Sequence, residues 1–371
     1  MKKTALLATS AIIAAGFVAA DASAVDVEMY GQVNKGVMLF DDGVSTEFNV
    51  VDNDYSSTRM GVKGSQALDN GLTASVLLEM ELQSNASDTL TQGSNTPADG
   101  YGANFTERHA RVGLAGEWGA VHVGATSSAS DFTTEQDLAG ANDVLGSDVE
   151  DIGGGLIVRT AAGGNADLDS STGGNQGLGA ALDNMDGNGR ANVLRYDSPI
   201  VNGFQGRASV AQGGDMDAAV FYNGRMDAIA VKGALGYLSN NDSAANTSDY
   251  VESQLSGSIS AKHDNGLGGT IAYGQQELGN KTAGNDDPTF WYLKAGYSWD
   301  AFEVAVDYSQ HEDIVTGDTT DAEVTVWGLG GQYNLGSGVS LAAYAKQFDV
   351  DYTGVNTDEV NVYGVNLRAK F

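Results

Sequence analysis

The sequence predicts an all-β fold, a transmembrane antiparallel β-barrel of about 16 strands, from three observations. Apolar and polar residues alternate along many segments, as in Ala301–Ser309, where Phe302, Val304 and Val306 lie on one face. Short turns alternate with long polar loops. After Val25 no apolar run approaches the ~18 residues of a membrane helix. A membrane location therefore requires a closed barrel, in which every backbone polar group finds a partner.

The strands follow from this alternation in chain order. They are predicted at residues 26–40, 56–65, 71–84, 105–116, 120–127, 190–198, 203–212, 217–224, 227–239, 249–263, 266–278, 289–299, 301–310, 322–335, 339–349 and 358–371. Gly- and Asn-containing turns are predicted at 69–71, 117–119, 264–266, 299–301 and 336–338. The longer polar loops are 41–55, 85–104, 128–189, 240–248, 279–288, 310–321 and 349–358.

A soluble β-sandwich would show a similar alternation. Sandwiches, however, rarely combine so many strands with a short turn at every second connection. Aromatic residues also gather at the predicted strand ends, where membrane barrels carry interfacial girdles. They are Tyr30, Phe40, Tyr101, Phe105, Trp118, Trp299 and Phe371. The barrel is the better interpretation.

Residues 1–24 are predicted to form a secretory signal peptide. A basic start with Lys2 and Lys3 precedes an apolar run from Ala5 to Ala20, and Ala22-Ser23-Ala24 forms a cleavage site. A membrane anchor is the alternative, but the run is short and no charged stop-transfer flank follows it. We therefore expect an exported protein whose residues 25–371 form a single barrel domain.

Charge and composition exclude several classes of protein. The chain has 19 Lys+Arg against 49 Asp+Glu, a net charge of −30, which excludes a nucleic-acid-binding surface. Removal of residues 1–24, with Lys2, Lys3 and Asp21, would change the net charge to −31. The absence of Cys excludes disulfides and thiolate metal sites.

Alternation also predicts which charged side chains face the interior of the barrel. If Met60 and Val112 face lipid, their neighbours Arg59 and Arg111 face inward, because a charge facing lipid at mid-depth costs about 2–4 kcal/mol. The same rule turns further side chains inward: Lys63, Glu107, His109, Arg195, Asp197 and Arg207.

Several motifs resemble Gram-negative general porins of the alpha- and beta-proteobacterial kind. Val27–Gly36 is similar to their first strand, Ser57–Gly64 to their second, and Arg111–Val121 to their fourth-to-fifth hairpin. Asn192–Pro199, followed by Asn202-Gly203-Phe204, is the most specific match. The chain ends in Phe371, as such barrels commonly do, and the resemblance implies that this residue serves barrel assembly.

The resemblance implies a homotrimer of 16-stranded barrels in the outer membrane of a Gram-negative bacterium. It would contact outer-membrane lipid and lipopolysaccharide and pass ions and small hydrophilic solutes by passive diffusion. In this family the third external loop folds inward and narrows the pore. Residues 128–189 occupy that place, and their Gly-rich second half, Gly163–Gly189, is predicted to protrude instead.

We expect this constriction to have an acidic and a basic side. The acidic side would come from the loop, with Asp131, Glu135, Asp137 and Asp143. The basic side would be Arg59, Lys63, Arg111, Arg195 and Arg207 on the wall. With the acidic net charge, this arrangement predicts a preference for cations.

Two other classes of outer-membrane barrel remain as alternatives. A lipase or protease needs a nucleophile beside a His, but His109 and His122 lie apart on adjacent predicted strands, and His311 lies at a loop edge. An adhesin or structural barrel would have apolar packing inside, whereas the inward faces read as polar and charged. No cofactor is expected. Asn184–Gly189 begins like an EF-hand, but Arg195 stands where Glu is required, which leaves only loosely bound Ca²⁺ at the acidic loops.

Overall fold

The computed structural model describes residues 26–93, 104–166, 168, 177–241, 249–314, 322–352 and 355–371. The predicted signal peptide and Tyr101 lie outside these residues. Within them no helix is long and apolar enough to cross a membrane.

Antiparallel strands make up nearly the whole fold, and two short 3₁₀ helices accompany them, η1 at Asp54–Ser56 and η2 at Leu178–Ala181. The strands are β1 Asp26–Asp41, β2 Thr46–Asp52, β3 Arg59–Ala67, β4 Thr73–Gln83, β5 Asn104–Gly116, β6 Gly119–Ser127, β7 Arg190–Asp197, β8 Phe204–Ala211, β9 Met216–Met226, β10 Ile229–Ser239, β11 Tyr250–His263, β12 Leu267–Gly279, β13 Thr289–Trp299, β14 Phe302–Glu312, β15 Ala322–Gly336, β16 Val339–Tyr352 and β17 Val360–Lys370.

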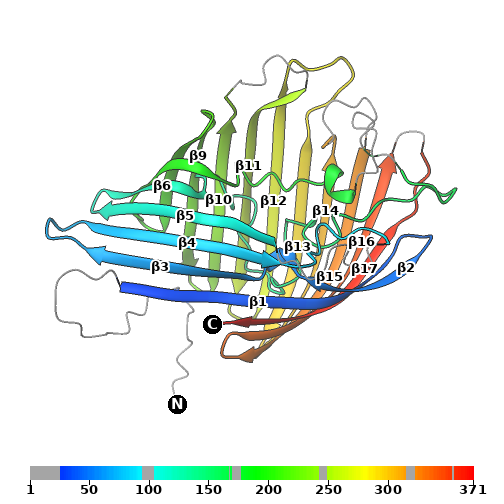
Figure 1. Cartoon of the computed structure of the whole chain (residues 1–371), viewed down its shortest axis with the longest axis horizontal. Coiled ribbons are helices and arrows are strands. Elements are labelled where there is room, and N and C mark those ends of the chain that lie inside the picture. Colours follow the sequence, from blue (N-terminus) through cyan, green and yellow to red (C-terminus); the bar gives the residue numbers. More distant parts are fainter. Residues whose placement is uncertain are drawn as a thin grey trace.

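The strands close into a 16-stranded barrel, as the sequence predicts. From β3 to β17 each strand pairs with the next, and β17 pairs with β1 from Gln32↔Lys370 to Asp41↔Asn361. In Figure 1, β3–β5 run nearly horizontally and β11–β15 nearly vertically, which reflects the strand tilt that closure requires. No open sheet edge therefore meets the lipid between β1 and β17.

Seventeen strands fill sixteen positions because the second position is interrupted. The first half of β1 pairs with β3, and its second half pairs with β2. Residues 53–58, which include η1, lie between β2 and β3. There the side-chain amide of Gln32 on β1 replaces the missing backbone hydrogen bonds: Nε2 donates to Ser56 O (2.7 Å) and Ser57 O (2.8 Å). The prediction of a loop over all of 41–55 is therefore wrong for β2.

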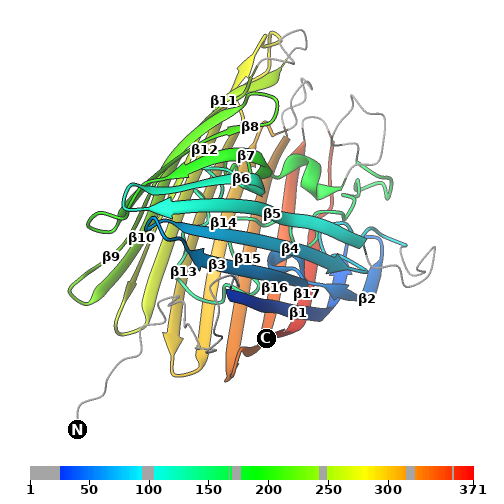
Figure 2. The ribbon, with the colours of Figure 1, turned by 60° about the vertical axis from the view of Figure 1, so that its left-hand side comes forward.

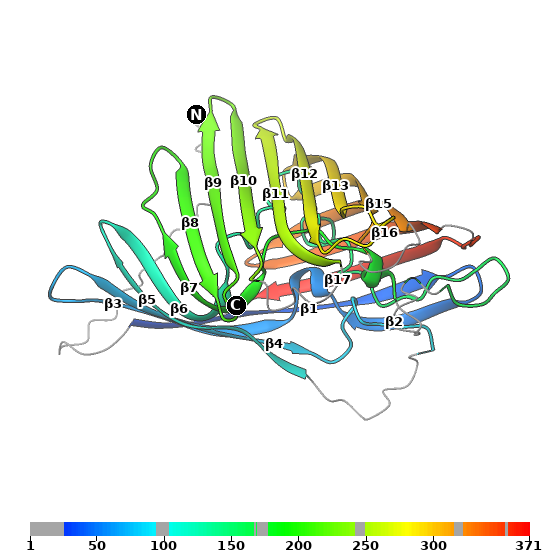
Figure 3. The same cartoon turned by 90° about the horizontal axis from the view of Figure 1, so that it is seen from above.

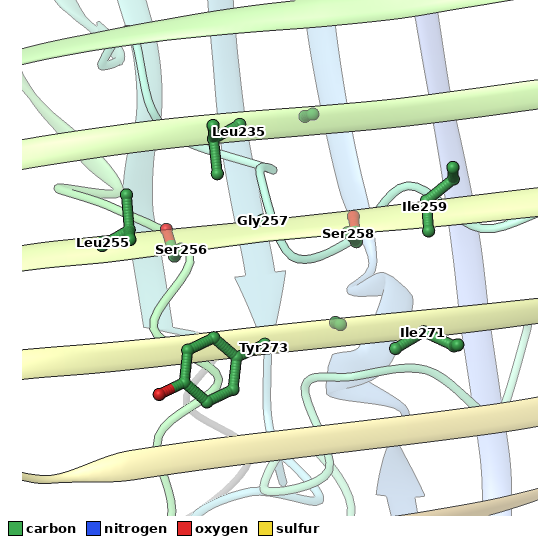
Figure 4. A pocket seen from close by; sticks show the side chains of 10 residues that line it. Leu235, Leu255, Ser256, Gly257, Ser258, Ile259, Ile271 and Tyr273 are labelled. Carbon is green, nitrogen blue, oxygen red and sulfur yellow. The ribbon is translucent and has the colours of Figure 1, made fainter.

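The two faces of each strand differ as the alternation predicts. In β11, Leu255 and Ile259 are about half exposed on the outer face, while Ser256 and Ser258 are buried on the inner face. Figure 4 shows Gly257 surrounded by large outer side chains, which leave a shallow apolar depression of about 270 Å³. An exposed apolar band of this kind suits contact with lipid hydrocarbon.

Aromatic side chains gather on the outer face near several short turns. Tyr297, Trp299, Phe302 and Tyr333 form a continuous stack across β13–β15, with ring centroids 4.5–5.8 Å apart. Trp118 stacks on Tyr196 in the same way. Two residues predicted for this girdle instead point inward.

The inward aromatics are Tyr30, which donates to Glu79 Oε2 (2.8 Å), and Phe40, which is fully buried. Both follow the period of β1, whose outer positions are Val27, Met29, Val33, Val37 and Leu39. A position near a strand end therefore does not by itself put an aromatic ring in the girdle.

A bulge in β5 changes the facing of one predicted residue. The register passes from Glu79↔His109 to Met80↔Glu107, so Arg108 has no partner on β4. Arg108 turns into the interior, and Glu107 is exposed beside Met80. The prediction that Glu107 faces inward is wrong because one extra residue shifts the period of two.

Candidate functional site

We call the long segment between β6 and β7, residues 128–189, the inner loop, because most of its described residues lie inside the barrel. Figure 3 shows its coil and η2 between the two walls of the barrel, and Figure 2 shows the same path from the side. Ala129 N donates to Ser209 Oγ of β8 (2.8 Å), and Ser130 N donates to Asp217 Oδ2 of β9 (2.7 Å). The loop is attached to the wall as soon as it leaves β6.

The attachment then continues in strand order. On β11, Gln136 N donates to Ser258 Oγ (3.0 Å) and Leu138 N to Ser260 Oγ (2.8 Å). Further along, Ala141 N donates to Glu303 Oε2 of β14 (2.9 Å) and Asp143 N to Gln332 Oε1 of β15 (3.2 Å). Polar side chains of the inner wall thus satisfy the loop backbone from β8 to β15.

Beyond Asp143 the inner loop fills one side of the interior with apolar side chains. Leu145, Ile152 and Leu156 are fully buried. The wall contributes Met38, Phe40, Phe290, Tyr292, Val324, Val326, Phe348, Val350, Val360 and Val362. Our expectation that inward faces are polar and charged is wrong for this part of β1 and β13–β17.

The returning part of the inner loop belongs to the same core. Leu178, Leu182 and Met185 are buried, and Gln254 Nε2 donates to Met185 O (2.8 Å). The prediction that Gly163–Gly189 protrudes is therefore wrong for 177–189. Residues 167 and 169–176 lie outside the described residues.

The predicted basic residue Arg59 lies on the inner face of β3 beside a compact ion-pair cluster. Its Nε is 3.9 Å from Glu79 Oε1. Arg108 donates to both carboxylates of β4, with Nε 2.9 Å from Glu79 Oε1 and Nη1 2.5 Å from Glu81 Oε2. Sequence reasoning missed Arg108 because the bulge that turns it inward leaves no mark on the alternation.

The other three predicted arginines lie on β5, β7 and β8. Arg111 Nη1 is 2.6 Å from His122 Nδ1, and His122 Nε2 is 3.6 Å from Asp197 Oδ2. Arg195 binds Asp197 with two hydrogen bonds, Nε to Oδ1 (2.9 Å) and Nη2 to Oδ2 (3.0 Å). These side chains form a polar row across four adjacent strands.

Arg207 ends this row on β8. Its guanidinium lies over the Phe221 ring, 4.0 Å from the centroid, and its Nε is 3.2 Å from Gln205 Oε1. Lys63 lies elsewhere: it is about half exposed near the short turn after β3, with Nζ 3.2 Å from Glu28 Oε1. The structure therefore groups Arg59, Arg111, Arg195 and Arg207 on β3–β8 and sets Lys63 apart.

The four acids predicted for the inner loop fall into two pairs. Asp137 accepts hydrogen bonds from Lys294 Nζ (2.7 Å) and Thr270 Oγ1 (2.6 Å), and Asp143 is held by Ser340 and Arg368. Both therefore anchor the loop to the wall of the barrel.

Among the described residues, no Lys or Arg forms an ion pair with Asp131 or Glu135. Burial, together with the neighbouring Asp186 carboxylate, raises the pKa of Asp131 to about 7 and the pKa of Glu135 well above its usual value. Crowding of this kind favours the neutral form of a carboxyl group, and Asp131 therefore changes its charge near neutral pH.

Three further carboxylates of the inner loop, which the sequence also offers for the acidic side of the constriction, share this environment. Burial raises the pKa of Asp148 to about 7 and that of Glu150 to about 9, with neighbouring carboxylates adding to each shift. Asp151 behaves in the same way. The acidic run at 148–151 is visible in the sequence, and the structure places it within the barrel, where the sequence predicts the acidic side.

A contact between the interrupted strand and the inner loop completes the site. Tyr55, from η1, lies so close to Gly146 that a Cβ at Gly146 would overlap its hydroxyl group. Asn53 Nδ2 donates to Asp143 O (3.2 Å) nearby. The wall at 53–58 therefore contacts the inner loop at residues 143–146.

The four histidines lie on four strands, β5, β6, β11 and β14. His122 pairs with Gly113, away from His109, as predicted. The placement of His311 at a solvated loop edge is wrong: it is buried in β14, with Nε2 3.1 Å from Ser309 Oγ and Nδ1 3.1 Å from Asp183 O. Among the described residues no group of three or more acidic or His side chains could hold a metal ion, and loosely bound Ca²⁺ stays a prediction.

Comparison with known proteins places this site in a family. The sequence matches the family model of Gram-negative porins over residues 5–353. A search of curated proteins finds no match. Among solved structures, the anion-selective porin from Comamonas acidovorans has a TM-score of 0.59 at 18% identity, covering 94% of this chain and 100% of that chain.

Two other structures are similar. The outer membrane channel DcaP of Acinetobacter baumannii has a TM-score of 0.57 at 11% identity, covering 94% of this chain and 97% of that chain. The trimer form of OmpT from Vibrio cholerae has a TM-score of 0.56 at 14% identity, covering 94% and 100%. Family and fold point to a channel and not to an enzyme. The chain belongs to the Gram-negative porin family and is an outer-membrane β-barrel channel.

Proposed function

We propose that this porin passes ions and small hydrophilic solutes by passive diffusion and prefers cations. The observation that carries the proposal is the contrast in charge between two sides of the barrel interior. The inner loop brings carboxylates into the barrel. Arginines line β3–β8, the part of the wall to which the backbone of the inner loop makes the fewest hydrogen bonds. A transverse field of this kind favours dipolar solutes over apolar ones, which would have to displace ordered water.

Cation preference follows from how the charges are paired. On the basic side, Glu79 and Glu81 balance Arg108, and Asp197 balances Arg195. On the acidic side, no Lys or Arg among the described residues forms an ion pair with Asp131, Glu135, Asp148, Glu150 or Asp151. Unbalanced carboxylates therefore outnumber unbalanced arginines when they are ionised.

The test is conductance across a planar lipid bilayer. Purified protein should give stepwise, ohmic conductance, and the reversal potential under a KCl gradient at about pH 9.5, where more of the inner-loop carboxyl groups are ionised, should show preference for K⁺. Absence of conductance from folded protein would reject the channel. Conductance with preference for Cl⁻ would reject only the cation preference.

We also propose a homotrimer embedded in outer-membrane lipid and lipopolysaccharide. The outer faces of β1, β3 and β4 carry aliphatic side chains such as Val27, Met60 and Leu78, and no exposed Trp or Tyr among their described residues. Girdle aromatics lie at the interface between lipid and water, so an outer face without them suits burial against a second copy. In the same bilayer recordings, channels should then close in groups of three.

A further inference from the structure

We propose that Lys294 and Lys346 are positioning residues: they clamp residues 145–149 of the inner loop from both ends and thereby set the place of Asp148 in the pore. This inference rests on the proposed channel function. Neither lysine was singled out by the sequence, because each occupies an ordinary inward position of its strand.

Each lysine donates to a backbone carbonyl at one end of the segment. Lys294 Nζ, on β13, is 2.8 Å from Leu145 O. Lys346 Nζ, on β16, is 3.1 Å from Val149 O. The two acceptors are separated by only Gly146, Ser147 and Asp148, so both ends of a five-residue segment are tied to the wall.

The two ammonium groups belong to one row across four strands. Lys294 pairs in register with Asp307 of β14, Asp307 with Gly328 of β15, and Gly328 with Lys346 of β16. Asp307 interacts electrostatically with both lysines and accepts a hydrogen bond from Tyr292 Oη (3.0 Å). Gly328 is required in the row, because a Cβ there would overlap Asp307 and meet Leu145.

Burial makes this clamp strong. The Lys294 side chain is 0% exposed and also donates to Asp137 Oδ2 (2.7 Å) and Asn142 Oδ1 (2.9 Å). Lys346 is among the most deeply buried side chains. If the loop shifted along the wall while still covering Lys294, the ammonium group would lose these loop acceptors, and a buried charge that loses its hydrogen-bond partners is strongly unfavourable.

The clamped segment presents one acidic side chain. Leu145 and Val149 are buried in the apolar core, and Ser147 is buried as well. Asp148 is partly exposed as a residue, while its Oδ1 is buried without a hydrogen-bond partner. Because both neighbouring ends are fixed, the position of this carboxylate depends on the two lysines.

The experiment compares K294M and K346M with K281M in planar bilayers. Methionine keeps most of the side-chain volume and removes the charge. Lys281 lies in the external loop 280–288 and pairs with Asp287 (2.6 Å), so K281M removes a similar ion pair far from the clamp. Folding of each variant is checked by its heat-dependent mobility on a denaturing gel.

We expect each clamp variant to change the K⁺/Cl⁻ permeability ratio about twofold or more and to show frequent sub-conductance steps, since the acidic side chain becomes mobile. K281M should match the parent protein, and K294R should restore the ratio in part. Folded K294M and K346M with parental selectivity and noise would overturn the clamp. Absence of conductance in the parent would instead reject the proposed function.

A second measurement covers the case in which the methionine variants do not fold. In the parent protein, a small amine-acylating reagent should modify Lys281 and leave Lys294 and Lys346 unmodified, as read by mass spectrometry. D137N, which removes one acceptor of Lys294, should increase its modification. Equal modification of Lys281 and Lys294 in the parent protein would overturn the clamp.

Discussion

The charge of the pore depends on individual carboxyl groups of the inner loop. Burial and mutual repulsion raise the pKa of Asp131 and Asp148 to about 7 and that of Glu150 to about 9. A raised pKa means that the neutral form persists to higher pH, so negative charge is lost as the pH falls through this range. The arginines of β3–β8 keep their charge over the same range.

Selectivity should therefore depend on pH. The K⁺/Cl⁻ permeability ratio is expected to fall between about pH 9 and about pH 6, because these carboxyl groups become neutral while the arginines stay charged. Reversal potentials measured across this range test it. D148N should lower the ratio at the higher pH and change it less at the lower pH, whereas D287N in an external loop should have little effect. A ratio independent of pH would contradict this assignment.

At the scale of elements, period two predicts the strands and the facing of Arg59, Arg111, Arg195 and Arg207. It cannot predict the β5 bulge, in which the single residue Arg108 shifts the pattern. It also cannot predict the course of the inner loop. Asp137 and Asp143 find their partners on β12, β13, β16 and β17, more than 100 residues away, and no local pattern encodes such contacts.

The external ends of several elements meet at Asp42, which is buried. Arg159 Nε of the inner loop is 2.8 Å from Asp42 Oδ2, and Gln92 Nε2 is 3.0 Å from it. Burial by itself raises the pKa of Asp42. Hydrogen bonds outweigh this effect and lower the pKa to about 2; they come from Arg159, Ser45, Val44 and Gln92. Asp42 is therefore ionised at neutral pH and holds three loops together.

R159M should loosen this junction, because it leaves the Asp42 carboxylate buried without its cation. Cleavage within 157–166 by a nonspecific protease is expected to become several-fold faster, on the order of a 1–2 kcal/mol change in local opening. R225M removes the exposed pair with Asp264 and should change cleavage little. Equal cleavage of R159M and the parent protein would show that Asp42 does not hold the loop.

At the scale of the whole molecule, barrel closure joins the two ends of the described chain. Phe371 N donates to Gly31 O and Gly31 N donates to Phe371 O, each at 3.0 Å. The Phe371 ring lies over Gly31, where a Cβ would collide with it. The last residue thus extends the β1–β17 ladder beyond Lys370 and covers the seam.

Deletion of Phe371 should slow assembly, because it removes two ladder hydrogen bonds and the ring that covers the seam. The folded, heat-modifiable fraction after refolding into detergent is expected to appear several-fold more slowly. L367A removes apolar area from the outer face of the same strand and serves as the control, with little change in rate. Parental kinetics for the deletion would contradict a role in closure.

The interruption between β2 and β3 gives the wall itself a part in the dimensions of the pore. Tyr55 projects from this interruption against Gly146, at one end of the clamped segment. The width of the pore is therefore set by two parts of the wall: Lys294 and Lys346 act from β13 and β16, and Tyr55 acts from the interruption between β2 and β3. Inserting or deleting a single residue within 53–58 would displace the tyrosine and resize the aperture, with the sequence of the inner loop unchanged.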